Sequence, residues 1–273
     1  MEIRQRLKMG WDMTVRHKYV LVLLFLYRFL WGFFLYRFVD SVVTPVIARY
    51  PSEHPNSDAA HLFLVEAQFR LLKTDLIDEL LWMLGGMLLL RMAVTPLFNA
   101  GIYYSFHHAG EGQSTRVLTG IRKAWKPVTL LYWLENGLIL LPAAWIVPIA
   151  KERFFSEASL TIWLQGLLPL AAAWVLYGFA VHLLGQFMQF GAASKTGILN
   201  SLGLAIRRAV PLLGITLVLI GIGLAVSAAA WVVSLLWSGL VAVTLHQAFH
   251  FVRSLLKLWT VASQYQVWSD AKT

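Results

Sequence analysis

The sequence has no cysteine and few charged residues. The absence of cysteine excludes a disulfide framework, a thiolate nucleophile and any zinc or iron–sulfur site built on cysteine ligands. Charged residues make up only 14% of the 273 residues, whereas soluble domains contain about 25%. A glycine-rich phosphate loop, a serine nucleophile elbow and a Walker motif are also absent. Without a nucleotide-binding motif, any pumping would require a partner ATPase or an ion gradient, and no cofactor is predicted.

Apolar residues take the place of the missing charge. They form 58% of the sequence, with 12 tryptophans and 16 phenylalanines, and the mean hydropathy is +0.64. A soluble globule cannot bury so much apolar surface, and a membrane span needs about 20 apolar residues. The sequence therefore predicts an all-α, polytopic integral membrane protein with about six transmembrane helices. The predicted spans are residues 19–44, 78–104, 127–149, 160–188, 210–234 and 238–260.

Lysine and arginine set the predicted orientation of these spans. The net charge is +9, and most of it flanks the apolar segments, so a nucleic-acid partner is not predicted. Basic residues are retained on the cytoplasmic side of a membrane, and they are scarce in the segments that would be external if the N-terminus is inside. We therefore expect a multi-pass protein of the plasma (inner) membrane with both termini in the cytoplasm. The external basic residues are Arg49, Arg70, Lys73, Lys151 and Arg153.

Basic amphipathic helices are predicted before the odd-numbered spans. In the N-terminal one, Ile3, Leu7, Trp11 and Val15 recur every four residues, with basic side chains on the opposite side. Such helices lie in the membrane interface against anionic lipid, so membrane lipids are the predicted partners. The predicted cytoplasmic interfacial helices are residues 1–18, 113–126 and 197–209.

These amphipathic segments indicate an internal repeat. The segment IRKAWKP, which ends at Pro127, aligns with AIRRAVP, which ends at Pro211. We therefore predict a single transmembrane domain, residues 1–273, built from three units of an interfacial helix and a transmembrane hairpin. The alternative is that there is no repeat, and that these segments look alike only because basic amphipathic helices that precede a span share this pattern.

The repeated unit resembles the six-span membrane domain attached to some bacterial glycerophosphodiester phosphodiesterases and found in related bacterial membrane families. The resemblance covers most of the chain and rests on the basic helix, proline and apolar hairpin that begin at Arg122 and at Arg207. It implies that fold and a bacterial inner membrane. In those enzymes catalysis belongs to a soluble barrel, and this sequence contains nothing of that barrel. No active site is therefore carried over.

The largest predicted external segment is residues 46–77. Its second half has apolar residues at i, i+3, i+7, i+10 and i+14, which indicates an amphipathic helix that leads into the second span. These residues are Leu62, Val65, Phe69, Leu72 and Leu76. The helix either lies in the interface or forms a partner-binding surface, so a protein partner or a homo-oligomer is the alternative to lipid there.

Charged side chains within the predicted spans form the candidate site. A charge at the bilayer centre costs about 2.5–3.5 kcal/mol on insertion scales, so it is kept for pairing or for function. At a rise of about 1.5 Å per residue, Arg28 lies roughly 14 Å and Glu135 roughly 12 Å from the cytoplasmic end of its span. We predict that these two residues sit at one level in a midplane cluster. The cluster is Arg28, Arg91, Glu135 and His250, with Asn136 and Gln247 beside it.

Two interpretations of this cluster are open. In one, Glu135 pairs with an arginine and the cluster locks the helix bundle together. In the other, the excess positive charge attracts a phosphate or a carboxylate. His246 and His250 share a helix face and, with Glu135, form a possible metal ligand set, but the HExxH glutamate is absent, so no metal is predicted. His182 is expected nearer the cytoplasmic end of its span, away from this cluster.

The predicted function is non-catalytic. We expect a membrane protein that binds, senses or transports an anionic lipid or a small anion, or that serves as the membrane subunit of a larger complex. The alternative is an intramembrane enzyme that acts on a lipid-linked substrate, with Glu135 as acid or base and His250 as its partner. The alternative requires a polar cavity that joins these two side chains.

Overall fold

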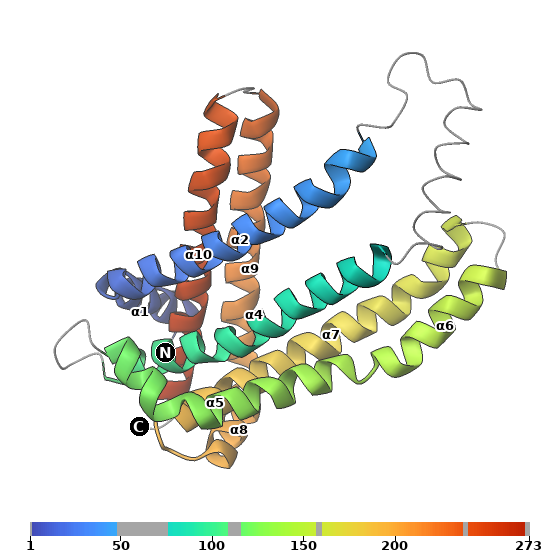
Figure 1. Ribbon diagram of the computed structural model, residues 1–273. Helices are drawn as coiled ribbons and strands as arrows, with labels where there is room; N and C mark the ends of the chain where they lie inside the picture. Colours follow the sequence, from blue (N-terminus) through green and yellow to red (C-terminus); the bar gives the residue numbers. More distant parts are fainter. Residues whose placement is uncertain (1, 48–75, 109–115, 157–159, 237–239, 271–273) are drawn as a thin grey trace, which may run out of the picture. The chain divides into compact units, whose positions relative to one another are not determined.

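A computed structural model describes residues 2–47, 76–108, 116–156, 160–236 and 240–270, which are α-helical apart from turns at the helix ends (Figure 1). A helix satisfies its backbone donors and acceptors within one segment, as a chain in hydrocarbon must. The predicted all-α class is confirmed for these residues. In order, the helices are α1 (Ile3–Arg16), α2 (Lys18–Ile47), α4 (Leu76–His107), α5 (Arg116–Leu140), α6 (Ala143–Ser156), α7 (Leu160–Ala193), α8 (Ile198–Arg207), α9 (Ala209–Leu236) and α10 (Leu240–Ser269).

Among the described residues, five helical stretches are long and apolar enough to cross a membrane. They are Lys18–Ser41, Trp82–His107, Arg116–Arg153, Gln165–Ala193 and Ala209–Val233. By helix length and composition, the chain is a multi-pass membrane protein. The predicted sixth span falls in α10, where the side chains of residues 240–248 lie outside the described part of the chain. Residues 48–75 of the predicted external segment also lie outside it.

The chain divides into two compact units. The first joins residues 1–21 to residues 95–273, and the second is residues 22–94, so the boundaries fall inside α2 and α4. In the first unit α5 packs against α7 and α9 packs against α10 (Figure 1). Each of these pairs joins helices that follow one another as predicted spans, while the predicted arrangement of three hairpins stays a prediction. In the second unit, large apolar side chains such as Leu30 and Leu88 are exposed, as suits helices that face lipid.

Two of the three predicted interfacial helices, α1 and α8, are separate from the long helix that follows each of them. α1 is capped by His17 and α8 by Arg208, where the backbone leaves helical geometry. The segment before the third predicted span differs, because α5 runs without a break from Arg116 through Pro127 to Leu140. Proline removes one helical hydrogen bond there without ending the helix. In α9 the corresponding Pro211 lies in the first turn, where no backbone donor is needed.

α1 packs along the last turns of α10. The indole of Trp259 donates a hydrogen bond to the carbonyl of Leu7 at 2.9 Å, and its ring meets Trp11 edge-on at 5.1 Å between centroids. Arg6, which is 4% exposed, pairs with Asp270 at 3.1 Å. α1 thus turns a polar side toward the protein. The apolar side chains that it leaves exposed are Ile3, Trp11 and Val15.

An aromatic cluster forms the core of the first unit, between α4, α7 and α10. Phe190 of α7 lies at its centre, with ring centroids 4.8 Å from Tyr103, 5.4 Å from Tyr265 and 6.0 Å from Trp268. All four side chains are buried. Each such aromatic pair contributes about 0.5–1.5 kcal/mol beyond the area it buries. The cluster therefore fixes this end of α7 against its neighbours.

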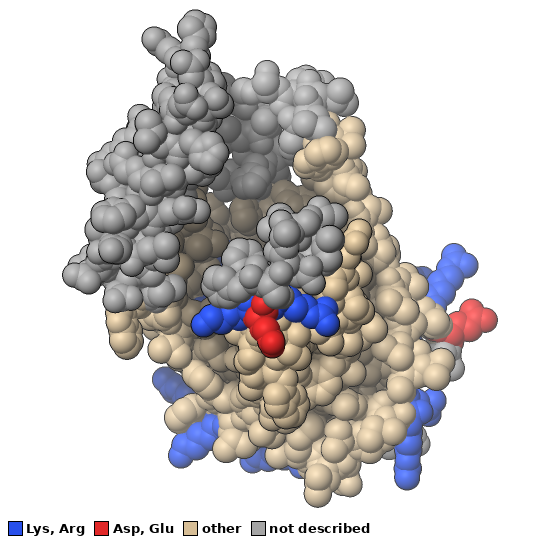
Figure 2. Space-filling view, turned by 90° about the vertical axis from the view of Figure 1, so that its right-hand side faces the viewer, with Lys and Arg blue, Asp and Glu red and all other residues tan. Residues whose placement is uncertain are grey.

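Uncharged side chains predominate on one face of the described residues. Figure 2 shows broad areas of uncharged side chains, with lysine and arginine gathered in a few places. Exposed apolar side chains also lie beside the basic residues of α5 and α8: Leu118 and Trp125 on α5, and Leu199 and Ile206 on α8. Together with α1, all three predicted interfacial segments leave an apolar side uncovered, which suits contact with lipid.

Candidate functional site

Glu135 is a buried carboxylate inside an apolar helix. It lies in α5, within the stretch Arg116–Arg153 that is long enough to cross a membrane, and it is 6% exposed. Its place eight residues after Pro127 puts it roughly 12 Å further along the helix. An ionisable side chain at such a depth is costly, so this position marks a candidate site.

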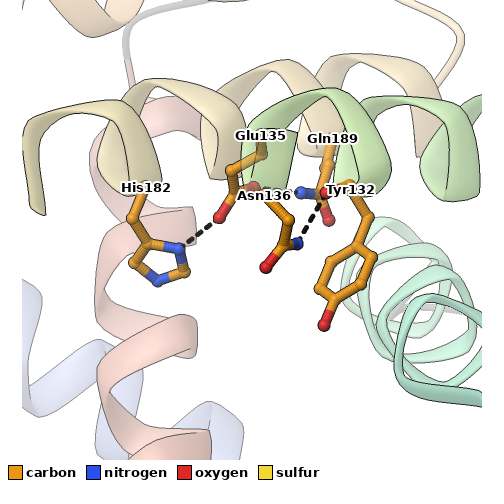
Figure 3. Close-up of polar contacts among 5 residues, drawn as sticks. All are labelled: Tyr132, Glu135, Asn136, His182 and Gln189. Atoms are coloured by element: carbon orange, nitrogen blue, oxygen red, sulfur yellow. Dashed lines mark hydrogen bonds and ion pairs between the residues drawn. The ribbon is translucent and has the colours of Figure 1, made fainter. Parts of the chain in front are cut away.

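Two side chains of α7 bind the carboxylate, one at each oxygen (Figure 3). The Nδ1 atom of His182 lies 2.6 Å from Oε1 of Glu135, and Nε2 of Gln189 donates to Oε2 at 2.7 Å. An ionised carboxylate only accepts hydrogen bonds, so Nδ1 of His182 carries the hydrogen in that state. These two hydrogen bonds join α5 to α7, and the bonded residues are separated by 47 and 54 positions in the sequence.

Gly185 makes room for this carboxylate at the crossing of α5 and α7. It lies three residues after His182 and four before Gln189, a spacing that puts all three on one face of α7. A Cβ atom at Gly185 would lie 2.6 Å from Oε2 of Glu135 and 2.9 Å from its Cδ. The absence of a side chain at Gly185 therefore lets the carboxylate reach between its two partners.

The two hydrogen-bond partners of Glu135 differ in exposure, so the site has an exposed side at His182 and a closed side at Gln189. The side chain of His182 is 58% exposed, whereas Gln189 is 2% exposed. The Oε1 atom of Gln189 is buried and has no hydrogen-bond donor among the described residues. On the closed side Tyr103 of α4, which is 5% exposed, interacts electrostatically with Glu135 and Tyr132. The site thus consists of a buried carboxylate that is hydrogen-bonded to a buried amide and to a histidine on the outer side of α7.

The residues of the predicted cluster are divided between the two units. Arg28 and Arg91 belong to the unit of residues 22–94, and His250 lies on α10, where its carbonyl accepts a hydrogen bond from Ser254. Asn136 donates to the carbonyl of Tyr132 on its own helix at 2.7 Å. The side chains of His246 and Gln247 lie outside the described residues. The predicted four-residue cluster stays a prediction.

The predicted metal ligand set lies partly outside the described side chains, because it includes His246. Within the described part of the chain, no group of three or more histidine, aspartate or glutamate side chains is arranged to hold a metal ion.

His182 is the site residue that the sequence analysis missed. The predicted span ended at residue 188, but α7 continues to Ala193. Counted from that end, His182 lies roughly 16 Å along the helix, close to the depth of Glu135 counted from Pro127. The spacing of His182, Gly185 and Gln189 on one face of an otherwise apolar helix was the available signal.

A groove of about 570 Å³ opens at the turn between α7 and α8. It is lined by Pro127 of α5, by Gly191 and Ala192 at the end of α7, by Lys195 in the turn that follows α7, and by residues 197–200 at the start of α8. We call it the Lys195 groove. It lies where the stretch Gln165–Ala193 ends, next to the amphipathic helix α8.

Lys195 has a backbone conformation that favours glycine. Its φ of 57° lies in the left-handed region, and no other non-glycine residue in the described part of the chain has a positive φ. The N–H of Thr196 bonds to the carbonyl of Gly191, and that of Lys195 to the carbonyl of Ala192. This is the Schellman pattern, in which glycine usually takes the position of Lys195. A lysine there costs about 1–2 kcal/mol, which points to a use for its side chain.

Comparison with protein-family models, with curated proteins and with solved structures finds no match. The resemblance drawn from the sequence therefore stays a prediction.

Proposed function

We propose that this protein is a six-span protein of the inner membrane, with both termini in the cytoplasm, and that it binds an anionic lipid at its cytoplasmic end. The headgroup occupies the Lys195 groove and the acyl chains lie along the apolar sides of the neighbouring helices. Binding of this kind serves sensing or transport of the lipid, and no covalent chemistry is required.

The strained backbone of Lys195 is the observation that carries this proposal. A left-handed lysine is kept at a position where glycine would relieve strain, and its exposed side chain lines the groove. Gly197, the N-cap residue of α8, offers no side-chain cap, so the backbone N–H groups of the first turn of α8 are available to an anion. An ammonium group and free N–H donors together suit a phosphate oxygen.

The surroundings of the groove support a lipid in place of a free ion. Leu199, which lines the groove, is 79% exposed, and Ile206 on the same helix is 63% exposed. Arg207 and Arg208 follow at the end of α8, where the helix meets α9. Basic pockets beside exposed apolar residues at the cytoplasmic ends of spans suit the headgroups of anionic lipids.

The test compares retained lipid in purified wild type and variants. Delipidated protein in detergent is mixed with phosphatidylglycerol or phosphatidylcholine, and native mass spectrometry counts bound lipid. We expect preferential binding of phosphatidylglycerol by wild type. Lys195→Gln should lower its affinity about fivefold, because one basic residue near the surface contributes about 1 kcal/mol.

Lys151→Gln on α6 is the matched control, since this exposed lysine lies far along the chain from the groove. It should bind phosphatidylglycerol as wild type does. Equal binding by wild type and Lys195→Gln would refute the lipid site. Binding of inorganic phosphate at the same affinity as the lipid would indicate a free-anion site.

The alternative enzyme hypothesis with Glu135 and His250 stays a prediction. The hydrogen bonds described at the carboxylate of Glu135 come from His182 and Gln189, so the geometry gives that alternative no specific support.

A further inference from the structure

We propose that Trp268, in the last turn of α10, is the positioning residue of the Lys195 groove. Through Ser201 it orients the peptide group that turns an N–H toward the anionic headgroup. The inference rests on the proposed lipid binding, and its test separates the failure of one from the failure of the other.

Ser201 lies where the start of α8 meets the end of α7, and it is 1% exposed. A Cβ atom at Gly191 would lie 2.6 Å from the carbonyl oxygen of Gly197 and 2.8 Å from Cβ of Ser201, so the two helices touch at this glycine. Gly191 and Gly197 also line the groove. The wall of the groove and the contact at Ser201 are therefore parts of one turn.

Two hydrogen bonds in series connect Trp268 to that turn. The indole Nε1 of Trp268 donates to Oγ of Ser201 at 3.1 Å, and this hydroxyl donates to the carbonyl of Gly197 at 3.0 Å. An indole N–H can only donate, so it leaves the hydroxyl hydrogen of Ser201 for that carbonyl. Trp268 is 0% exposed and packs beside Phe190, with 6.0 Å between the ring centroids. The two bonds are thus anchored in the aromatic cluster.

The carbonyl of Gly197 belongs to the same peptide group as the N–H of Ile198. In a planar trans peptide the C=O and N–H bonds point in opposite directions. Because the carbonyl is turned toward Ser201, the N–H of Ile198 points away from it, out of the start of α8, where both residues line the groove. The first N–H groups of a helix have no acceptor within it, so this one is available to a phosphate oxygen.

The backbone of Gly197 does not fix this orientation by itself. Its φ is 99°, in a region that residues with a side chain rarely adopt, and glycine reaches the other regions at little cost. A groove whose N–H is correctly oriented for only part of the time binds its ligand more weakly in proportion to that fraction. By holding Ser201, Trp268 raises the affinity for the headgroup although it is buried away from it.

The test measures phosphatidylglycerol affinity by native mass spectrometry, and the unfolding temperature, for the same variants. Trp268→Phe keeps an aromatic ring in the core and removes the indole donor. We expect its affinity to be about two- to tenfold lower than that of wild type, the factor that corresponds to one neutral hydrogen bond.

Trp259→Phe is the matched control. It removes an indole hydrogen bond of 2.9 Å from the same helix, in this case to the carbonyl of Leu7 on α1. Both variants should lower the unfolding temperature, and only Trp268→Phe should lower the affinity. An equal loss of affinity in the two variants would mean general destabilisation and would overturn the positioning role.

Ser201→Ala keeps the inference testable if Trp268→Phe fails to fold, because it removes a buried hydroxyl and adds no volume. It should lower the affinity by a similar factor, and the double variant should lose no more than either single one, since both act through one series of bonds. Additive losses, or wild-type affinity in either single variant, would overturn the positioning role and leave the lipid site standing. The absence of phosphatidylglycerol binding by wild type would overturn the lipid site and this inference with it.

Discussion

Gly185 of α7 and Glu135 of α5 meet at the helix crossing, where a Cβ atom at the glycine would lie 2.6 Å from Oε2 of the carboxylate. The glycine is therefore required by the carboxylate and not by helix–helix packing alone. Gly178 lies two turns earlier on α7 and faces the same helix, but a Cβ atom there would meet Ile139 at an ordinary 3.5 Å. The two glycines form a matched pair.

Gly185→Ala should displace the carboxylate of Glu135 and weaken its bonds to His182 and Gln189. We expect a loss of about 1–3 kcal/mol in stability, the usual result of overpacking a tight crossing. Gly178→Ala should be neutral or gain about 0.5–1 kcal/mol, because alanine is the better helix residue. Thermal unfolding in detergent measures both. An equal response of the two variants would contradict the assigned contact.

Lys195→Gly should separate stability from lipid binding. Glycine adopts the left-handed region without strain, so the variant should gain about 1 kcal/mol in stability while it loses the ammonium group in the groove. Lys195→Asn should behave similarly, since asparagine tolerates this conformation. Lys195→Arg keeps the charge and should retain lipid. The measurements are thermal unfolding and native mass spectrometry with phosphatidylglycerol. A lower stability of Lys195→Gly than of wild type would contradict the assignment of backbone strain to Lys195.

The sequence was sufficient to predict the helical membrane class, and it singled out Glu135 as a carboxylate inside an apolar run. Long apolar runs permit few structures in a bilayer, and a carboxylate within such a run stands out because of its cost. α1 and α8 also occur at predicted positions, and each leaves apolar side chains uncovered.

The partner of Glu135 could not be predicted, because pairing depends on which faces of two helices meet. The polar face of α7 with His182 and Gln189 does not reveal which helix it meets, and an error of five residues in the end of α7 moved His182 away from the level of Glu135. The predicted boundary between an interfacial helix over 113–126 and a span over 127–149 is not marked by a break in α5. One missing hydrogen bond does not end α5, since the turns on either side remain intact.

A matched pair of threonines tests the polar contacts inside the hairpins. The hydroxyl of Thr216 on α9 accepts a hydrogen bond from the buried amide of Gln264 on α10 at 3.0 Å. Thr216→Val keeps the shape and removes the acceptor, so we expect a loss of about 1–3 kcal/mol. The hydroxyl of Thr129 on α5 is buried without a partner among the described residues. Thr129→Val should therefore be neutral or stabilising, and the reverse order in thermal unfolding would contradict both assignments.

The ion pair of Arg6 and Asp270 joins the two ends of the chain through α1 and α10. Arg6 is 4% exposed, whereas the side chain of Asp270 is 23% exposed, so the guanidinium bears the larger desolvation penalty. Asp270→Asn leaves that buried charge without its carboxylate. We expect a loss of about 1.5–3 kcal/mol, the range for hydrogen bonds to charged groups.

A double-mutant cycle separates the pair from the packing of each side chain. Arg6→Met keeps most of the apolar stem, and combined with Asp270→Asn it removes both charges. The double variant should be more stable than the sum of the two single losses predicts, with a coupling of about 0.5–3 kcal/mol. Arg4→Met removes an exposed charge from the same helix and should change stability by less than about 0.5 kcal/mol. Additive single losses would mean that α1 is held by its contacts with Trp259 and not by the ion pair.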